Sequence, residues 1–170
     1  MGRKEKKVIV ILFVLCMLAG LYAVQGYGIN VDENTEINIA RMDEKEYVRV
    51  FFGEESRLFR YMDSLIEDLM VSVEIDHGES VLYPAVAVVS VLRAAGRADL
   101  GMLFYHIYLY VWFLFGLLAA YKVGKYLTGK IIFGAMAAAL IGLNPLLFGN
   151  SFINNKDMIM LSLTSICTCF

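Results

Sequence analysis

The stretch "LGMLFYHIYLYVWFLFGLLAAY", residues 100–121, decides the fold because its 22 consecutive residues include no Asp, Glu, Lys or Arg. An α-helix needs about 20 predominantly apolar residues to cross the hydrocarbon core of a bilayer. The composition points the same way: 59% of the 170 residues are hydrophobic and the mean hydropathy is +0.62. A soluble domain is nearer to about 45–50% apolar. We therefore predict a membrane protein with a transmembrane helix at 100–121.

Further apolar segments lie on both sides of this span. Residues 8–24 form a longer run than the core of a signal peptide, and no A-x-A-like cleavage site follows, so we predict a retained anchor. Residues 131–149 are rich in Gly and Ala, which let helices approach closely in lipid, and we expect this span to pack inside a bundle. Residues 157–170 begin a further transmembrane helix. We expect the chain to be the N-terminal piece of a longer protein and to be inactive by itself.

The short apolar segment at 80–95 is predicted not to cross the membrane. Its uncharged part is short for a span and suits a re-entrant or interfacial helix. Basic loops favour the cytoplasm, and two groups of lysines fall on that side together only if 80–95 does not cross. These are Lys4, Lys6 and Lys7 at the N-terminus and Lys122, Lys125 and Lys130 after the predicted span at 100–121. Arg93 and Arg97 argue for the opposite topology, and Asp99 partly offsets them.

The loop at 25–79 is predicted to be extracytoplasmic and helical. It carries 14 of the chain's 17 acidic residues. Residues 56–73 repeat apolar side chains at helical spacing opposite a charged face, which is typical of a helix lying along a membrane. Residues 35–52 are a weaker candidate for a second such helix. The predicted class is all-α: a polytopic transmembrane helix bundle whose extracytoplasmic first loop holds membrane-parallel amphipathic helices.

Composition also removes several kinds of site from consideration. Cys16, Cys167 and Cys169 lie in apolar runs, which gives neither a disulfide framework nor a zinc spacing. The net charge of −2 indicates no nucleic-acid partner. His106 lies inside the predicted span at 100–121, near Tyr105 and Tyr108, where a hydrogen bond within the helix bundle is the simpler interpretation. The residue pattern alone predicts no metal site.

Three polar sets converge on the outer face in this topology, and they are the candidate site. The first is an acidic pair after the first span, the second precedes the short apolar helix, and the third precedes the last span. They are Asp32 and Glu33; Asp76, His77 and Glu79; and Asn154, Lys156 and Asp157. A carboxylate near the interface can accept a proton from a hydroxyl, and lysine with amides can hold a phosphate. Ordinary solvated surface charge remains the alternative for each set.

The order of these features resembles a known family. The "DE" pair at 32–33, "DHGESVLYP" at 76–84 and "FGNSFINNKD" at 148–157 are similar to elements of polytopic glycosyltransferases of the GT-C superfamily. These enzymes, of the protein mannosyltransferase and aminoarabinose-transferase type, use polyprenyl-phosphate-linked sugars. The resemblance covers most of residues 8–165. Asn150 and Asn155 depart from the family's pattern, which has His and Pro there.

The resemblance implies a role for each set. Asp32 would be the general base that activates the acceptor. The acceptor and donor region would be shaped by Glu33, Asp76, His77 and Glu79. The donor phosphate would be bound by Lys156, with Asp157 and Asn154 beside it. No cofactor is predicted with certainty, and a divalent metal is left open because family members differ in metal dependence.

The predicted function is therefore transfer of a sugar from a polyprenyl-phosphate-linked donor to an acceptor at the extracytoplasmic face. The expected location is the plasma membrane of a bacterium, with the N-terminus in the cytoplasm. The expected partners are the lipid-linked donor and the membrane. The alternative is a polytopic transporter, or a non-catalytic membrane subunit whose acidic loop binds a partner. A transporter would place ionisable groups near the bilayer midplane or in broken helices.

Overall fold

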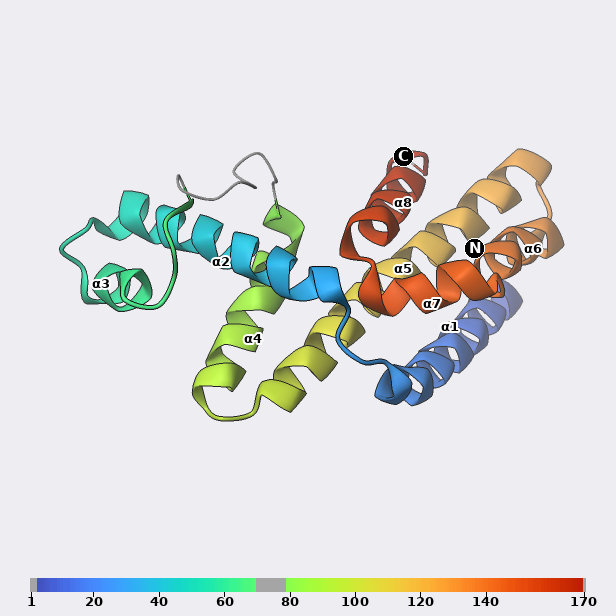
Figure 1. Ribbon diagram of the computed structural model, residues 1–170. Coiled ribbons are helices and arrows are strands. Elements are labelled where there is room, and N and C mark those ends of the chain that lie inside the picture. The colour runs from blue at the N-terminus through green and yellow to red at the C-terminus, as the bar shows by residue number, and fades with distance from the viewer. Residues whose placement is uncertain (1–2, 70–78, 170) are drawn as a thin grey trace. The chain divides into compact units, whose positions relative to one another are not determined.

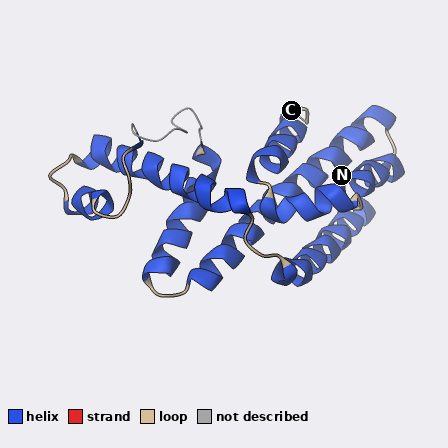
Figure 2. Cartoon of the chain, viewed as in Figure 1, coloured by secondary structure: helices blue, strands red, loops and turns tan. Residues whose placement is uncertain are grey.

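The computed structural model describes residues 3–69 and 79–169 (Figure 1). Over these residues the chain forms helices and connecting turns without a strand, so the predicted all-α class is confirmed for them (Figure 2). The helices are α1 Arg3–Ala23, α2 Val31–Phe52, α3 Arg57–Asp63, α4 Tyr83–Ala94, α5 Ala98–Thr128, α6 Ile131–Gly142, α7 Pro145–Ile153 and α8 Asn155–Cys167, with 3-10 turns at Val24–Gly26 and Ser80–Leu82.

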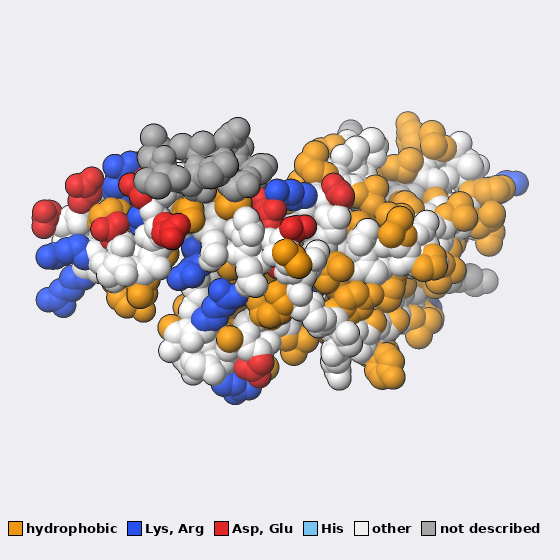
Figure 3. Space-filling model, in the orientation of Figure 1, with side chains coloured by type: hydrophobic (Ala, Val, Ile, Leu, Met, Phe, Trp, Pro, Cys, Tyr) orange, Lys and Arg blue, Asp and Glu red, His pale blue; other side chains and the backbone are white. Residues whose placement is uncertain are grey.

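The chain divides into two compact units, which we call the span unit and the loop unit. The span unit comprises Met1–Gly28 and His106–Phe170, and the loop unit comprises Ile29–Tyr105. On the face drawn in Figure 3, hydrophobic side chains cover much of the span unit and charged side chains gather on the loop unit. Each unit is described below by itself.

Within the described part of the chain, two helical segments are long and apolar enough to cross a membrane: Ile9–Gly26 and Ala98–Thr128. At about 1.5 Å per residue, the 31 residues of α5 span about 47 Å, which exceeds a hydrocarbon core of about 30 Å. On α1, Val10, Ile11, Leu15 and Leu18 are between 57% and 60% exposed, as suits a surface that faces lipid. These features support a membrane protein with two or three spans.

The span predicted over 131–149 is divided into α6 and α7, which meet at an angle of 65°. The division follows from the local sequence, because Asn144 and Pro145 are strong helix-start signals. The Asn144 side chain accepts hydrogen bonds from the backbone N–H groups of Leu146 and Leu147 at 3.0 and 3.2 Å. A cap inside an apolar run starts a new helix there, and α6 ends at Gly142.

Within the span unit, α1 and α5 run antiparallel. The start of α1 meets the end of α5 where Glu5 accepts hydrogen bonds from Tyr121 and Lys125. Further along, the Tyr110 hydroxyl donates to the Cys16 carbonyl at 2.8 Å. A side chain on Gly20 would overlap the Tyr110 ring, so the two helices approach this closely only because position 20 is glycine.

Small residues also bring α6 against α5, as the Gly- and Ala-rich sequence of α6 leads us to expect. A Cβ on Gly134 would lie 2.6 Å from the Tyr121 carbonyl oxygen, and one on Gly124 would lie 2.9 Å from Ala137 Cβ. The absence of side chains at both glycines therefore permits backbone-to-backbone contact.

At the opposite end of the span unit, aromatic rings join three elements. Phe152 of α7 stacks on Tyr110 of α5 with ring centroids 4.7 Å apart. Tyr27, which follows the first span, lies 4.6 Å from Phe152 by the same measure. The end of the first span and the end of α7 are thus at the same end of this unit.

The loop unit is built on α2, which contacts α3, α4 and the turn before α4. Its core consists of apolar side chains that are at most 2% exposed: Ile37, Ile39, Ala40, Leu82, Ala85, Val86 and Val89. The apolar helix Ser80–Ala94 has 15 residues and a length of about 22 Å, too short for a hydrocarbon core of about 30 Å. Whether it lies at or dips into a membrane stays a prediction.

Of the amphipathic helix predicted at 56–73, residues 70–73 lie outside the described residues, and in the described part the α-helix ends earlier than the periodicity suggests. Helix α3 ends at Asp63 because Ser64 turns the chain: its hydroxyl bonds the Tyr61 carbonyl, and the N–H groups of Leu65 and Ile66 both donate to Met62. By contrast, the weaker candidate at 35–52 lies wholly within α2, the longest helix of the loop unit.

Candidate functional site

Asp32 and Glu33 lie side by side on the first turn of α2 but have different surroundings. Asp32 is exposed, whereas Glu33 is 1% exposed. Glu33 Oε2 accepts from the Asn30 backbone N–H at 2.7 Å, while the Asn30 side chain in turn caps the first backbone N–H groups of α2. This reciprocal capping box stabilises the start of the helix. Glu33 is therefore committed to structure, and Asp32 is the carboxylate presented to solvent.

The third polar set opens α8. Asn154 Oδ1 accepts from the backbone N–H of Asp157 at 3.0 Å, and its amide donates to the Asp157 carboxylate, also at 3.0 Å. Lys156 and Asp157 are exposed, and Asn155 is buried. This set lies at the end of the span unit where Tyr27 meets Phe152, because Asn154 directly follows α7. Asn154 and Asp157 thus serve as a helix cap, with Lys156 exposed on the same turn.

The second set is described only in part. Asp76 and His77 lie outside the described residues. Glu79 is 6% exposed and directly precedes the 3-10 turn, where its carbonyl accepts from the Leu82 N–H at 2.8 Å. Glu79 is therefore a buried carboxylate at the start of the apolar helix of the loop unit.

The structure assigns the predicted residues to different units. Asp32, Glu33 and Glu79 belong to the loop unit, and Asn154, Lys156 and Asp157 belong to the span unit. Each set is placed within its own unit, so convergence of all three sets on one site stays a prediction.

A polar cluster that the sequence interpretation missed joins α2 to α4 in the loop unit. Arg93 of α4 donates from Nη2 to Asn34 Oδ1 at 3.3 Å, two residues beyond Asp32. Burial, followed by the positive charge of Arg41, lowers the pKa of Arg93. Two guanidinium groups thus face the same region, and the Nε of Arg41 is buried without a hydrogen-bonding partner among the described residues. This arrangement favours an anion between or beside the two arginines.

A carboxyl group with an unusual pKa lies on the same helix. Burial raises the pKa of Glu44 to about 7; Arg41 opposes this shift and the neighbouring charge of Asp43 adds to it. Asp43 in turn accepts a hydrogen bond from the Tyr83 hydroxyl at 2.9 Å. A carboxyl group that titrates near neutral pH suits proton transfer, so Glu44 joins Asp32 as a candidate acid or base.

Lys45 is a buried cation in the loop unit that pairs with the exposed carboxylate of Asp63. Its side chain is 3% exposed, and its Nζ donates to Asp63 at 3.1 Å and to the Ile66 carbonyl at 3.2 Å. This pair connects α2 to the end of α3 and is structural.

One pattern in the sequence could have indicated the buried glutamates of α2. Positions 33, 37, 40 and 44 share one face of a helix, and this face combines apolar residues with glutamates. A carboxylate on an otherwise apolar face indicates a buried polar contact. The order of charges along the loop does not reveal this pattern, because the pattern becomes visible only at helical spacing.

Among residues 3–69 and 79–169, no group of three His, Cys, Asp or Glu side chains is arranged to hold a metal ion. Comparisons with protein-family models, with curated proteins and with solved structures found no match.

Proposed function

We propose that this chain is part of a bacterial plasma-membrane glycosyltransferase that transfers a sugar from a polyprenyl-phosphate-linked donor to an acceptor. In this proposal the N-terminus is cytoplasmic, the loop unit is extracytoplasmic, and α2 and α3 lie near the outer membrane surface. The reaction needs a base for the acceptor hydroxyl and cations for the phosphate of the donor. The loop unit contains both kinds of group.

The observation that carries the proposal is the hydrogen bond between Arg93 and Asn34. It brings a guanidinium to the first turn of α2, where Asp32 is the exposed carboxylate. An exposed carboxylate of α2 and a guanidinium of α4 thus both lie near the start of α2, which supports the proposed roles of base and phosphate-binding cation. Arg41 supplies a second cation on that helix, and the anion they share would be the phosphate of the donor.

Proximity to the first span also supports this role for Asp32. Asp32 lies six positions after Gly26, the end of the candidate span, which limits the distance between their Cα atoms to about 20 Å. A polyprenyl-phosphate donor keeps its phosphate at the membrane surface, within reach of groups held this close to a span.

The test is transfer of labelled sugar from a polyprenyl-phosphate donor by membranes that contain the complete gene product. Asp32→Asn should lower turnover by about 100-fold or more, the usual contribution of a general base. Arg93→Gln should chiefly raise the KM for the donor. Glu55→Gln and Arg57→Gln remove exposed charges elsewhere in the loop unit and should leave both values unchanged.

Each result has a definite meaning. Full activity in Asp32→Asn would exclude its role as the base, and loss of activity in Glu44→Gln alone would assign that role to Glu44. No sugar transfer by the unaltered gene product from any polyprenyl-phosphate sugar would contradict the proposal itself.

A second candidate, a transporter, is favoured by the 65° break between α6 and α7. Transporters place substrates at breaks in their spanning helices. At this break, however, the Asn144 side chain is used to cap α7, and the segment 131–153 contains no Asp, Glu, Lys or Arg. Substrate uptake by vesicles that is abolished by Asn144→Ala, with sugar transfer absent, would favour this candidate over the enzyme.

A further inference from the structure

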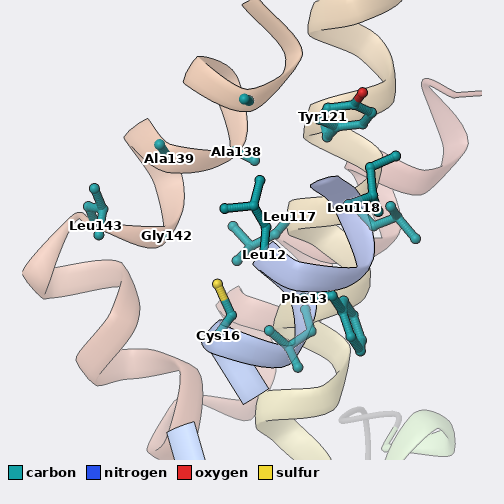
Figure 4. Close-up of a pocket in the computed structure, with 13 residues that line it drawn as sticks. Leu12, Phe13, Cys16, Leu117, Leu118, Tyr121, Ala138, Ala139, Gly142 and Leu143 are labelled. Carbon is teal, nitrogen blue, oxygen red and sulfur yellow. The ribbon is translucent and has the colours of Figure 1, made fainter. Parts of the chain in front are cut away.

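An apolar groove runs between α1, α5 and α6 in the span unit. It encloses about 220 Å³ and is lined along its length by Leu12, Cys16, Leu117, Ala138, Ala139 and Gly142 (Figure 4). The side of the groove formed by α6 carries alanine and glycine, and these small residues make the hollow. Its volume exceeds that of an apolar cavity of about 150 Å³ that admits benzene.

The groove has a polar end. Figure 4 shows Tyr121 at one end of the lining residues, with its hydroxyl pointing away from the leucines. A second cavity shares Ile9, Leu118 and Tyr121 with the groove and continues it. The further lining of this second cavity includes Glu5, Lys122, Lys125 and Tyr126.

The charges at this end select the kind of ligand. Glu5 is 5% exposed and holds Lys125 in an ion pair, which fixes the position of that ammonium group. Lys122 is exposed one turn earlier on α5. Two lysines and one glutamate among the lining residues leave a net charge of +1, and the Tyr126 hydroxyl adds a hydrogen-bond donor, whereas that of Tyr121 already donates to Glu5. An anionic head would be attracted here, whereas an apolar helix would not complement this end.

From this geometry we propose that the groove is a binding site for an anionic phospholipid. One acyl chain lies between α1, α5 and α6, and the phosphate of the headgroup lies beside Lys122 and Lys125. Basic pockets between transmembrane helices bind anionic headgroups in this way. The site is distinct from the groups proposed for sugar transfer, because neither its apolar lining nor its polar end includes any of those residues.

The experiment uses the full chain in phosphatidylcholine nanodiscs that contain a trace of photoactivatable lipid with a diazirine in the acyl chain. One arm uses phosphatidylglycerol and the other phosphatidylcholine, and labelled peptides are mapped by mass spectrometry. Phosphatidylglycerol should label α1 and α6 about five-fold more than phosphatidylcholine, the effect expected of one added cation at a membrane surface. Equal labelling by the two lipids would overturn the proposal.

Paired variants separate the groove from the rest of the surface. Ala139→Phe fills the groove and should abolish labelling, whereas Leu140→Phe alters the adjacent, 75% exposed position outside the lining and should not. Lys122→Gln should reduce labelling by phosphatidylglycerol to the phosphatidylcholine level. Lys130→Gln removes an exposed lysine that lines neither cavity and should change it little.

The comparison of Lys122→Gln with Lys130→Gln still tests the proposal if Ala139→Phe fails to fold. Both lysines are exposed, so neither replacement should disturb the fold. Unchanged labelling in Lys122→Gln would contradict the assigned headgroup position. Labelling that persists in folded Ala139→Phe would contradict the assigned occupant. A cross-link from α6 to another polypeptide, in place of the lipid, would also contradict it.

Discussion

The two units are held together by different interactions, although both are made of helices. In the span unit, α1 and α6 contact α5 through glycines and aromatic rings, as at Gly20 with Tyr110. In the loop unit, α2 is joined to its neighbours by polar groups as well as by its apolar core, as at Lys45 with Asp63. In lipid the hydrophobic effect does not drive helices together, so close packing between the helices must supply the stability. In water, burial, caps and ion pairs share this role.

The largest effect should come from disturbing the close contact in the span unit. Gly20→Ala places a methyl group where the Tyr110 ring lies, and that ring is fixed by its hydrogen bond to Cys16 and its stacking on Phe152. We expect a loss of about 3 kcal/mol, the upper end for overpacking, measured by thermal unfolding in detergent. Gly26→Ala is the control because no atom lies within 4 Å of its added Cβ. Equal stability of the two variants would show that α1 does not pack on α5 here.

The corresponding change in the loop unit removes the partner of Lys45. Asp63→Asn removes the negative charge beside the buried ammonium, although the new amide oxygen and the Ile66 carbonyl can still accept its hydrogen bonds. The expected loss is about 2 kcal/mol, measured by chemical denaturation. Glu54→Gln breaks the exposed pair with Arg49 and should cost much less. If both variants lose the same free energy of unfolding, burial of Lys45 does not strengthen its ion pair with Asp63.

A smaller effect should follow from loss of the cap on α2. Asn30→Ala removes the side chain that caps the first turn and should cost about 1 kcal/mol. The control, Asn38→Ala, replaces an exposed asparagine inside the same helix and should be neutral or slightly stabilising. Circular dichroism during thermal unfolding measures both. A neutral Asn30→Ala would mean that tertiary contacts alone fix this end of α2.

The last effect concerns the pH dependence of stability. Because burial raises the pKa of Glu44 from 4.5 to about 7, the folded state keeps a proton that the unfolded state loses between these values. This stabilisation is complete below pH 4.5 and is lost as the pH rises through about 7. Glu44→Gln should therefore raise Tm at pH 8 relative to the unaltered chain and have little effect at pH 4.5. Glu55→Gln, an exposed control, should shift Tm little at either pH. If the difference in Tm between Glu44→Gln and the unaltered chain were the same at both pH values, burial of Glu44 would be contradicted.

Much of the fold could be predicted from hydrophobic run length, because a run of 22 uncharged residues has few stable states apart from a spanning helix. The break at Asn144 was missed because a cap signal was outweighed by apolar composition on both sides. The end of α3 at Asp63 was missed because periodicity continues in the sequence after Ser64 turns the chain. Hydrophobic patterning locates helices better than it locates their ends.

The candidate site was less predictable. Asp32 and Glu33 look equivalent in sequence, and only the capping geometry separates the exposed carboxylate from the buried one. Arg93 was considered only as a topology signal, since its hydrogen bond to Asn34 joins positions 59 residues apart. Contacts of this separation depend on how α4 packs on α2, which local patterns do not specify.

The central claim is that residues 25–99 stay on one face of the membrane, and cysteine labelling tests this most directly. Single cysteines would be placed at the exposed positions Thr35, Ala98 and Lys130, in a chain whose native Cys16, Cys167 and Cys169 are replaced by alanine. With a membrane-impermeant maleimide on intact cells, we predict labelling of Thr35→Cys and Ala98→Cys, and labelling of Lys130→Cys only after permeabilisation. Labelling of Thr35→Cys and Ala98→Cys from opposite sides would show that the segment at 80–95 crosses the membrane and would contradict the account.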